Sequence, residues 1–160
     1  LILHYLRTSS GDELLSKTSV LSEELVEQRS KRAKYRIDMS DEPGSYEESE
    51  LRELLVQYLS QDMVTPRRIR QVLIPLCLET DHVTREDLKS ELVNRGEAED
   101  LSKAGYAQSV ISGQFGLKKN DFLRQVIGYG YPNNPWEKDN YFIRPNYREL
   151  VNQILDELLS

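Results

Sequence analysis

The chain has 160 residues, of which 38% are hydrophobic and 30% charged, and its formal net charge is −6. This length allows one ordinary domain or two small ones with a modest core, and the acidity excludes a chain that coats nucleic acid over its whole surface. No apolar run approaches the roughly 20 residues that span a bilayer, so we expect no membrane segment. We place the protein in the cytoplasm, or in the nucleus if it is eukaryotic.

The N-terminal part of the chain is expected to be helical. The first residue is not Met, and we expect a domain excised from a longer protein. Helical spacing of apolar residues predicts a helix from Glu13 to about Lys34. The run 29–36 then holds five bases in eight residues. Two interpretations stay open: a patch that contacts phosphate, or a solvated helix end where cations suit the dipole.

An acidic, turn-rich stretch follows from Asp38 to Glu50. Pro43-Gly44 is a strong breaker inside it, which predicts a linker or a mobile loop. We therefore divide the chain into an N-terminal helical segment, residues 1–42, and a second domain, residues 46–160. A helix capped at Ser45 or Ser49 then runs to about Gln61.

The next two helices carry clear start and stop signals. Thr65-Pro66 opens the first, since proline at a first helical turn loses no hydrogen bond, and Pro75 should end or kink it. Cys77 is the only cysteine and lies in an apolar run, so we expect a buried structural thiol in a reducing compartment. Thr84-Arg85-Glu86-Asp87 resembles a capping box, and the helix that it starts stops at Gly96.

The region after Gly96 predicts two helices and a hairpin. One helix covers about 101–114 with Ala104, Ala107, Val110 and Ile111 inward, and Gly116 breaks it. Asn120-Asp121 caps a second helix, expected over about 119–127. A hairpin follows with its tip at 132–135 and a strand at 140–144, and Asn146 caps the last helix. The hairpin aromatics are expected mostly to pack against the helix: Tyr129, Tyr131, Tyr141 and Phe142.

The charges of the chain are unevenly distributed. From Lys103 to Arg148 seven bases stand against three acids, a balance of +4, which leaves −10 for the rest. A separation of this kind is typical of a protein that presents one face to an anion.

Residues 66–144 resemble the winged helix-turn-helix superfamily, in which three helices precede a hairpin. The resemblance is generic and implies a mostly α fold with a small β-hairpin. It also implies DNA binding, with the second helix of the motif, here about 119–127, in the major groove. In that position arginine and glutamine would contact bases, the lysines phosphate, and the hairpin tip the backbone or minor groove. The residues expected at the DNA are Lys118, Lys119, Asn120, Arg124, Gln125, Asn133, Asn134, Trp136 and Lys138.

The first functional hypothesis is therefore a DNA-binding module, either a transcriptional regulator or the recognition domain of a larger DNA-processing or restriction enzyme. The partner would be double-stranded DNA. The alternative is a protein-interaction or assembly module that uses the same scaffold, with the acidic N-terminal helices docking a partner or a second copy. Two histidines and one cysteine predict no zinc site, and we expect no cofactor and no catalytic activity in this chain.

Overall fold

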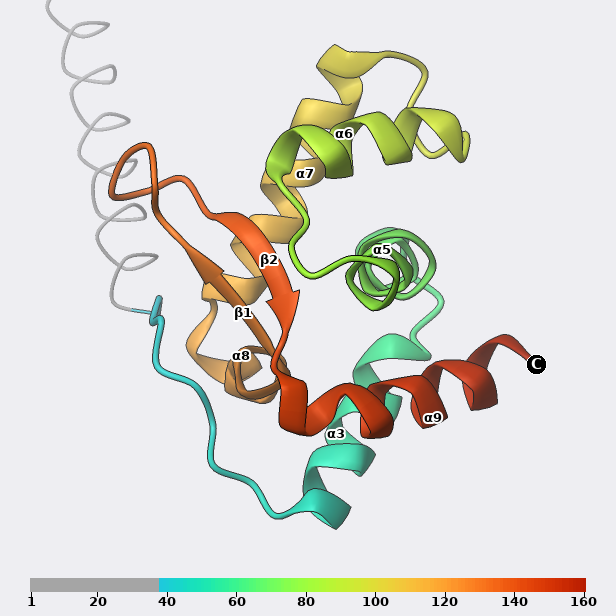
Figure 1. Cartoon of the computed structure of the whole chain (residues 1–160), viewed down its shortest axis with the longest axis vertical. Coiled ribbons are helices and arrows are strands. Elements are labelled where there is room, and N and C mark those ends of the chain that lie inside the picture. The colour runs from blue at the N-terminus through green and yellow to red at the C-terminus, as the bar shows by residue number, and fades with distance from the viewer. Residues whose placement is uncertain (1–37) are drawn as a thin grey trace, which may run out of the picture. The chain divides into compact units, whose positions relative to one another are not determined.

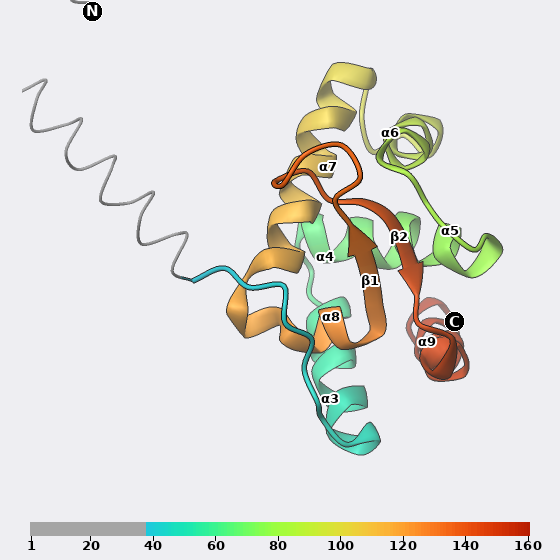
Figure 2. The ribbon, with the colours of Figure 1, turned by 60° about the vertical axis from the view of Figure 1, so that its left-hand side comes forward.

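The computed structural model describes residues 38–160, which form helices around a small two-stranded hairpin (Figures 1 and 2). The expected class, mostly α with a β-hairpin, is confirmed for this part of the chain. The predicted N-terminal helix and the basic run 29–36 lie outside the described residues. Ser40 to Ser160 form one compact unit.

The helices are α3 (Glu48–Leu59), α4 (Val64–Arg68), α5 (Ile74–Glu79), α6 (Arg85–Asn94), α7 (Leu101–Gly116), α8 (Asp121–Val126) and α9 (Arg148–Leu159). The antiparallel hairpin consists of β1 (Ile127–Gly130) and β2 (Asp139–Ile143). Short 3₁₀ turns at Lys118–Asn120 and Pro145–Tyr147 precede α8 and α9.

Pro75 does not end its helix, since α5 continues from Ile74 to Glu79. A π-helical segment, Ile69–Leu73, joins α4 to α5, and the Ile74 N–H bonds to the Ile69 carbonyl five residues back. Proline has no N–H to offer the carbonyl four residues before it, that of Gln71. Arg95 Nη1 donates to that oxygen at 2.9 Å. A side chain from the end of α6 thus supplies the donor that Pro75 lacks.

Both ends of α6 follow the sequence signals. Thr84 Oγ1 accepts from the Asp87 N–H at 3.1 Å, and Asp87 Oδ2 accepts from the Thr84 N–H at 3.2 Å, which completes the capping box. Gly96 has a φ of 76°, the left-handed conformation that glycine adopts at low cost. The turn from α6 to α7 is therefore fixed by local chemistry.

Three predicted side-chain caps are wrong. Helix α3 has Glu47 at its N-cap and no side-chain cap, rather than a cap from Ser45 or Ser49. The helix expected over 119–127 covers only Asp121–Val126, and Asn120 does not cap it, because its Nδ2 donates back to the Gln114 carbonyl at 2.8 Å. Asn146 does not cap the last helix either; α9 begins at Arg148 after Tyr147, with no side-chain cap.

Both strands of the hairpin contribute side chains to the core. Ile143 pairs with Ile127 across the hairpin, and Tyr141 bridges to Val83 in the linker before α6. Tyr141 and Phe115 are fully buried, and their ring centroids lie 5.7 Å apart. Helix α3 packs against α8 and α9, α6 packs against α7, and β2 packs against α5.

An extended strap, residues 40–46, runs beside α8 to the start of α3 (cyan in Figures 1 and 2). The Ser40 N–H donates to the Gly116 carbonyl at 2.8 Å, and the Gly44 N–H donates to the Asp121 carbonyl at 2.9 Å. The prediction of a linker or mobile loop is wrong for these residues, since backbone hydrogen bonds hold them to the domain.

Candidate functional site

The polar residues of α8 point into the protein, not away from it. Arg124 is 2% exposed, Gln125 5% and Asn120 3%. The prediction that these three form the outer face of a reading helix is wrong in geometry. A helix of six residues with five of them buried leaves almost no surface to lay in a groove.

Arg124 binds main-chain carbonyls. Its Nη1 donates to Phe115 at 2.9 Å and to Leu117 at 2.6 Å, and its Nε donates to Glu42 in the strap at 2.7 Å. A guanidinium has its donors in a fixed planar fork, which suits several acceptors around one buried centre. Arg124 therefore ties the end of α7 to the strap.

Gln125 holds the strap in the same way. Its Oε1 accepts from the Tyr46 N–H at 2.9 Å, and its Nε2 donates to the Tyr46 carbonyl at 3.0 Å. The amide thus pairs with one residue of extended backbone as a neighbouring strand would. Tyr46 OH also donates to Asp121 Oδ1 at 2.7 Å, and this hydrogen bond raises the pKa of the tyrosine.

The hairpin tip is closed by its own polar groups. Asn134 Nδ2 donates to Glu137 Oε2 at 3.0 Å, and its Oδ1 accepts from the Trp136 N–H at 3.1 Å. Asn133 is exposed, with a long contact of 3.4 Å to Asp139. Trp136 is 79% exposed and is the one large hydrophobic side chain that the tip leaves open to solvent.

Lys138 is buried over two aromatic rings. It is 7% exposed, and its Nζ lies 5.4 Å from the Tyr129 centroid and 5.8 Å from that of Tyr131. Both tyrosine hydroxyls donate to Asp41 Oδ1 of the strap, at 2.8 and 2.7 Å. Burial lowers the pKa of Lys138. The hairpin aromatics pack as expected, and Lys138 is part of that packing.

Every arginine between residues 38 and 160 donates a hydrogen bond within the domain. Four of them bind carbonyls in the last turn of a helix or at its cap: Arg70 at α3, Arg148 at α5, Arg124 at α7 and Arg144 at α8. These carbonyls have no partner within their own helices, and cations there also suit the helix dipole. Four of the nine arginines between residues 38 and 160 are therefore helix-end caps.

Of the four lysines between residues 38 and 160 that are not buried, two form salt bridges within this part of the chain and two do not. Lys89 pairs with Glu86, and Lys103 with Glu99. Lys118 and Lys119 are exposed, and neither forms a salt bridge among residues 38–160. The described residues hold 14 bases and 22 acids, a balance of −8. Of the seven bases over 103–148, two are buried and two are half-buried, and only Lys103, Lys118 and Lys119 are exposed.

Helix α7 presents the face that sequence reasoning missed. Tyr106 is 76% exposed and Leu101 60%, with Ser102 and Ser109 exposed beside them. On the other side, Gln108 accepts from Arg85 Nη2 at 2.7 Å, and Arg85 pairs with Glu137 of the hairpin tip. The inward pattern of Ala104 and Ala107 already put Tyr106 on the outer face by helical spacing.

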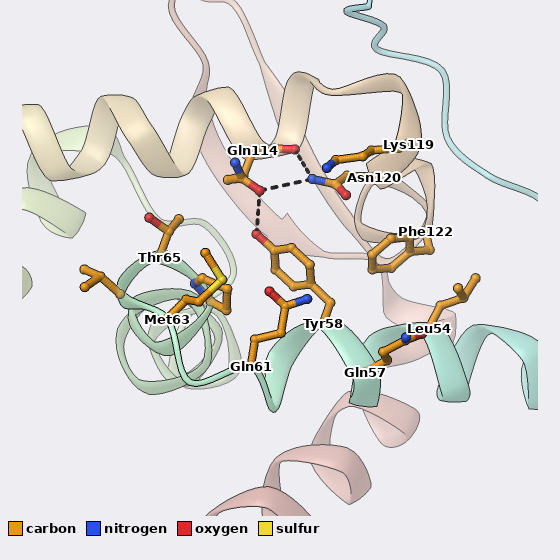
Figure 3. A pocket seen from close by; sticks show the side chains of 12 residues that line it. Leu54, Gln57, Tyr58, Gln61, Met63, Thr65, Gln114, Lys119, Asn120 and Phe122 are labelled. Atoms are coloured by element: carbon orange, nitrogen blue, oxygen red, sulfur yellow. Dashed lines mark hydrogen bonds between the residues drawn. The ribbon is translucent and has the colours of Figure 1, made fainter.

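A groove lies between α3 and the α7–α8 region (Figure 3). It has a volume of about 760 Å³, and Lys119 is the only charged residue among the side chains that line it. Tyr58 OH donates to Gln114 Oε1 at 3.0 Å, and Asn120 Nδ2 contacts the same oxygen at 3.3 Å (Figure 3). Lys119 and Asn120, predicted at DNA, thus belong to a wall of this groove.

The described residues bring together no catalytic set. Cys77 is buried, as expected, and burial raises its pKa to about 12, far from a thiolate at neutral pH. Among residues 38–160, no group of three histidine, cysteine or carboxylate side chains is placed to hold a metal ion.

In this part of the chain, no helix combines the length and the apolar character needed to cross a membrane. No family model matches the chain, and no curated protein or solved structure matches it.

Proposed function

We propose that residues 38–160 form a protein-interaction module on a winged-helix scaffold. The placement of the basic side chains carries this proposal: every described arginine donates within the domain, and four of the nine cap helix ends, while Tyr106 and Trp136 stay exposed. Tyrosine and tryptophan are the side chains most enriched at the centres of protein interfaces. The acidic balance of −8 also favours a protein partner over DNA.

The order of elements supports the choice of scaffold. The helical path α4–α5, then α6, then α7 precede the hairpin, as three helices precede the wing in that superfamily. The pair α6–α7, joined at Gly96, takes the place of the helix-turn-helix. Helix α7 is then its second helix, and α8 is a short insertion before the hairpin. The contact surface would be the outer face of α7 with the hairpin tip.

The chemistry of that surface favours protein. The exposed side of α7 holds Leu101, Tyr106 and two serines, and its N-terminal end carries Glu99 and Asp100. Carboxylates at the end of a helix that reads bases would face phosphate and repel it. An aromatic centre with a polar rim is instead the usual composition of a protein interface.

Photo-crosslinking of the full chain in the cell that makes it tests the proposal. Benzoylphenylalanine replaces Tyr106 or Trp136, and Asn152 on the exposed side of α9 is the matched control. We expect a discrete, protease-sensitive adduct at 106 and 136 that is absent at 152. Nuclease-sensitive adducts, equal adducts at all three positions, or no adduct would overturn it.

DNA binding is the competing proposal, and the two exposed lysines, Lys118 and Lys119, favour it. Two phosphates neutralised would give a slope of about 1.8 log units of affinity per log unit of salt. Titration of Trp136 fluorescence with duplex DNA at two salt concentrations measures this slope. If the domain is a protein-interaction module, it should show no tight binding to DNA at low salt. The double substitution Lys118→Glu with Lys119→Glu should then leave the fluorescence titration unchanged.

A further inference from the structure

The groove of Figure 3 is a second surface, separate from the outer face of α7. Its α3 wall carries Leu54, Gln57 and Tyr58, and its other walls come from the α3–α4 turn with Gln61, from α7 and from α8. Leu54 to Tyr58 covers one helical turn, about 6 Å. The groove is therefore long enough for apolar side chains that are one helical turn apart.

Apolar side chains are left open at one end of the groove. Met63 is 62% exposed and Val64 47%, and both line it. Phe122 and Leu54 lie at the other end (Figure 3). Methionine adapts its shape to a partner, and neighbouring exposed apolar residues are typical of a binding surface.

The polar wall of the groove is held in place before any partner arrives. Gln114 joins Tyr58 to Asn120, and Asn120 also donates to the Gln114 carbonyl at 2.8 Å. Burial raises the pKa of Tyr58, so its hydroxyl stays a donor. A preorganised wall loses little conformational entropy on binding.

The approach to the groove along α3 is acidic, whereas Lys119, the one charged side chain among those that line the groove, lies on the opposite wall (Figure 3). Glu50 lies one turn before Leu54 and continues the face that lines the groove, since residues four apart share a helix face. Glu53 lies at the edge of that face, and Asp62 lies between two lining residues, Gln61 and Met63. From residue 41 to 53 the chain has six acids and one base, Arg52.

We infer that this groove binds an amphipathic helix of a partner protein, with an apolar stripe and a net basic charge. The stripe fills the space between Met63 and Phe122, and its basic flank meets Glu50 and Glu53. An acidic domain attracts such a segment from a distance, and the carboxylates then fix its direction in the groove. A helix laid in a groove presents its anchors at the one-turn spacing that α3 offers.

A displayed peptide library tests the inference against the full chain. Each member is a 14-residue amphipathic helix with leucine at i, i+4 and i+7, and with its flanking positions randomised among Lys, Glu and Gln. We expect enrichment of net basic members. Their affinity should fall at least tenfold for Met63→Gln with Val64→Gln, which removes apolar surface without a change in charge at exposed positions where folding is little affected.

Charge exchange tests the direction of binding. Glu50→Lys should weaken the enriched peptides, and replacing one peptide lysine by glutamate should restore their binding. Two variants serve as controls and should bind as the wild type does: Tyr106→Ala, which tests the α7 surface separately, and Leu159→Glu, an exposed apolar position elsewhere. No enrichment, enrichment of acidic members, or equal binding to the Met63/Val64 variant would overturn the inference.

Discussion

At the scale of single residues, arginine has an unexpected place in this protein. Arginine side chains often bind anions, yet here Arg124, Arg144 and Arg148 donate to carbonyl oxygens at helix ends. A buried carbonyl without a donor costs about 1–3 kcal/mol. The planar fork of arginine satisfies two or three such groups at once.

Arg124→Met should lower the free energy of unfolding by about 3 kcal/mol, because three carbonyls lose their donor. Urea denaturation of the full chain measures the change. Lys118→Met, at an exposed position with no salt bridge among the described residues, is the control and should stay within about 0.5 kcal/mol of wild type. Equal losses for the two variants would contradict the capping role.

Glu97 gives stability a dependence on pH. The hydrogen bond from Arg67 and, to a smaller extent, that from Arg68 hold the pKa of Glu97 below its usual value of 4.5. The folded state thus favours the carboxylate, so its contribution is complete at neutral pH and is lost as the pH falls below about 4.5. Glu97→Gln should cost about 1 kcal/mol at pH 7, and this difference should shrink toward pH 3.

Denaturation at several pH values measures that difference for Glu97. Glu53→Gln, at an exposed carboxylate on α3, is the control and should follow the wild-type profile. A constant gap between wild type and Glu97→Gln from pH 7 to pH 3 would show that the Arg67–Glu97 pair has no such role.

At the scale of elements, alanine substitution at two glycines should change the stability in opposite directions, although both positions have room for a methyl group. Gly96 has a φ of 76°, and a side chain there is strained, so Gly96→Ala should destabilise by about 1 kcal/mol. Gly105 lies within α7, and a Cβ there would meet only Lys89 Cδ at 3.8 Å. Gly105→Ala should therefore stabilise by about 0.5–1 kcal/mol.

Thermal denaturation of the two glycine variants side by side gives the signs directly. Because the substitution is the same, a shared effect of the added methyl group cancels in the comparison. Changes of the same sign would mean that backbone conformation does not decide the outcome at Gly96.

Local signals predicted the elements well where their partners are close in sequence. The capping box at Thr84, the stop at Gly96 and the hairpin all depend on residues a few positions apart. The orientation of Arg124 and Gln125 depends on a strap about 80 residues earlier in the chain. No pattern around position 124 contains that information, so polar residues on α8 were expected to face solvent.

The expectation that the helix over about 119–127 carries the exposed polar face is wrong for a related reason. Gly116 and Gly96 both break helices, and the basic residues near Lys118 favoured the later turn. The exposure of Tyr106 on α7 could be predicted from the spacing of Ala104 and Ala107. The groove could not be predicted from the sequence, because its walls come from three separate parts of the chain.

At the scale of the whole molecule, the strap should contribute to the stability of the domain. A chain that starts at Asp38 keeps the bonds from Ser40, Gly44 and Tyr46, and a chain that starts at Glu47 loses them. With Arg124 also left without the Glu42 carbonyl, the shorter chain should be less stable by about 4 kcal/mol.

Urea denaturation and amide hydrogen exchange of the two chains measure the effect of the strap. Exchange should quicken at the end of α7 and in α8, where the strap is bound, and change least in α6. Equal midpoints for the two chains would show that the strap follows the fold without supporting it.

The way that the strap is held has a consequence for which mutations the protein tolerates. Arg124 and Gln125 recognise the backbone of Glu42 and Tyr46, and so do not read which side chains these residues carry. Glu42 and Ser45 should accept almost any substitution, while positions 124 and 125 accept few. Substitutions at positions 42 and 45 can thus alter the charge of the α3 approach at little cost in stability. The other strap positions are not free in this way, because the side chains of Asp41 and Tyr46 form their own hydrogen bonds and Gly44 has no room for a Cβ.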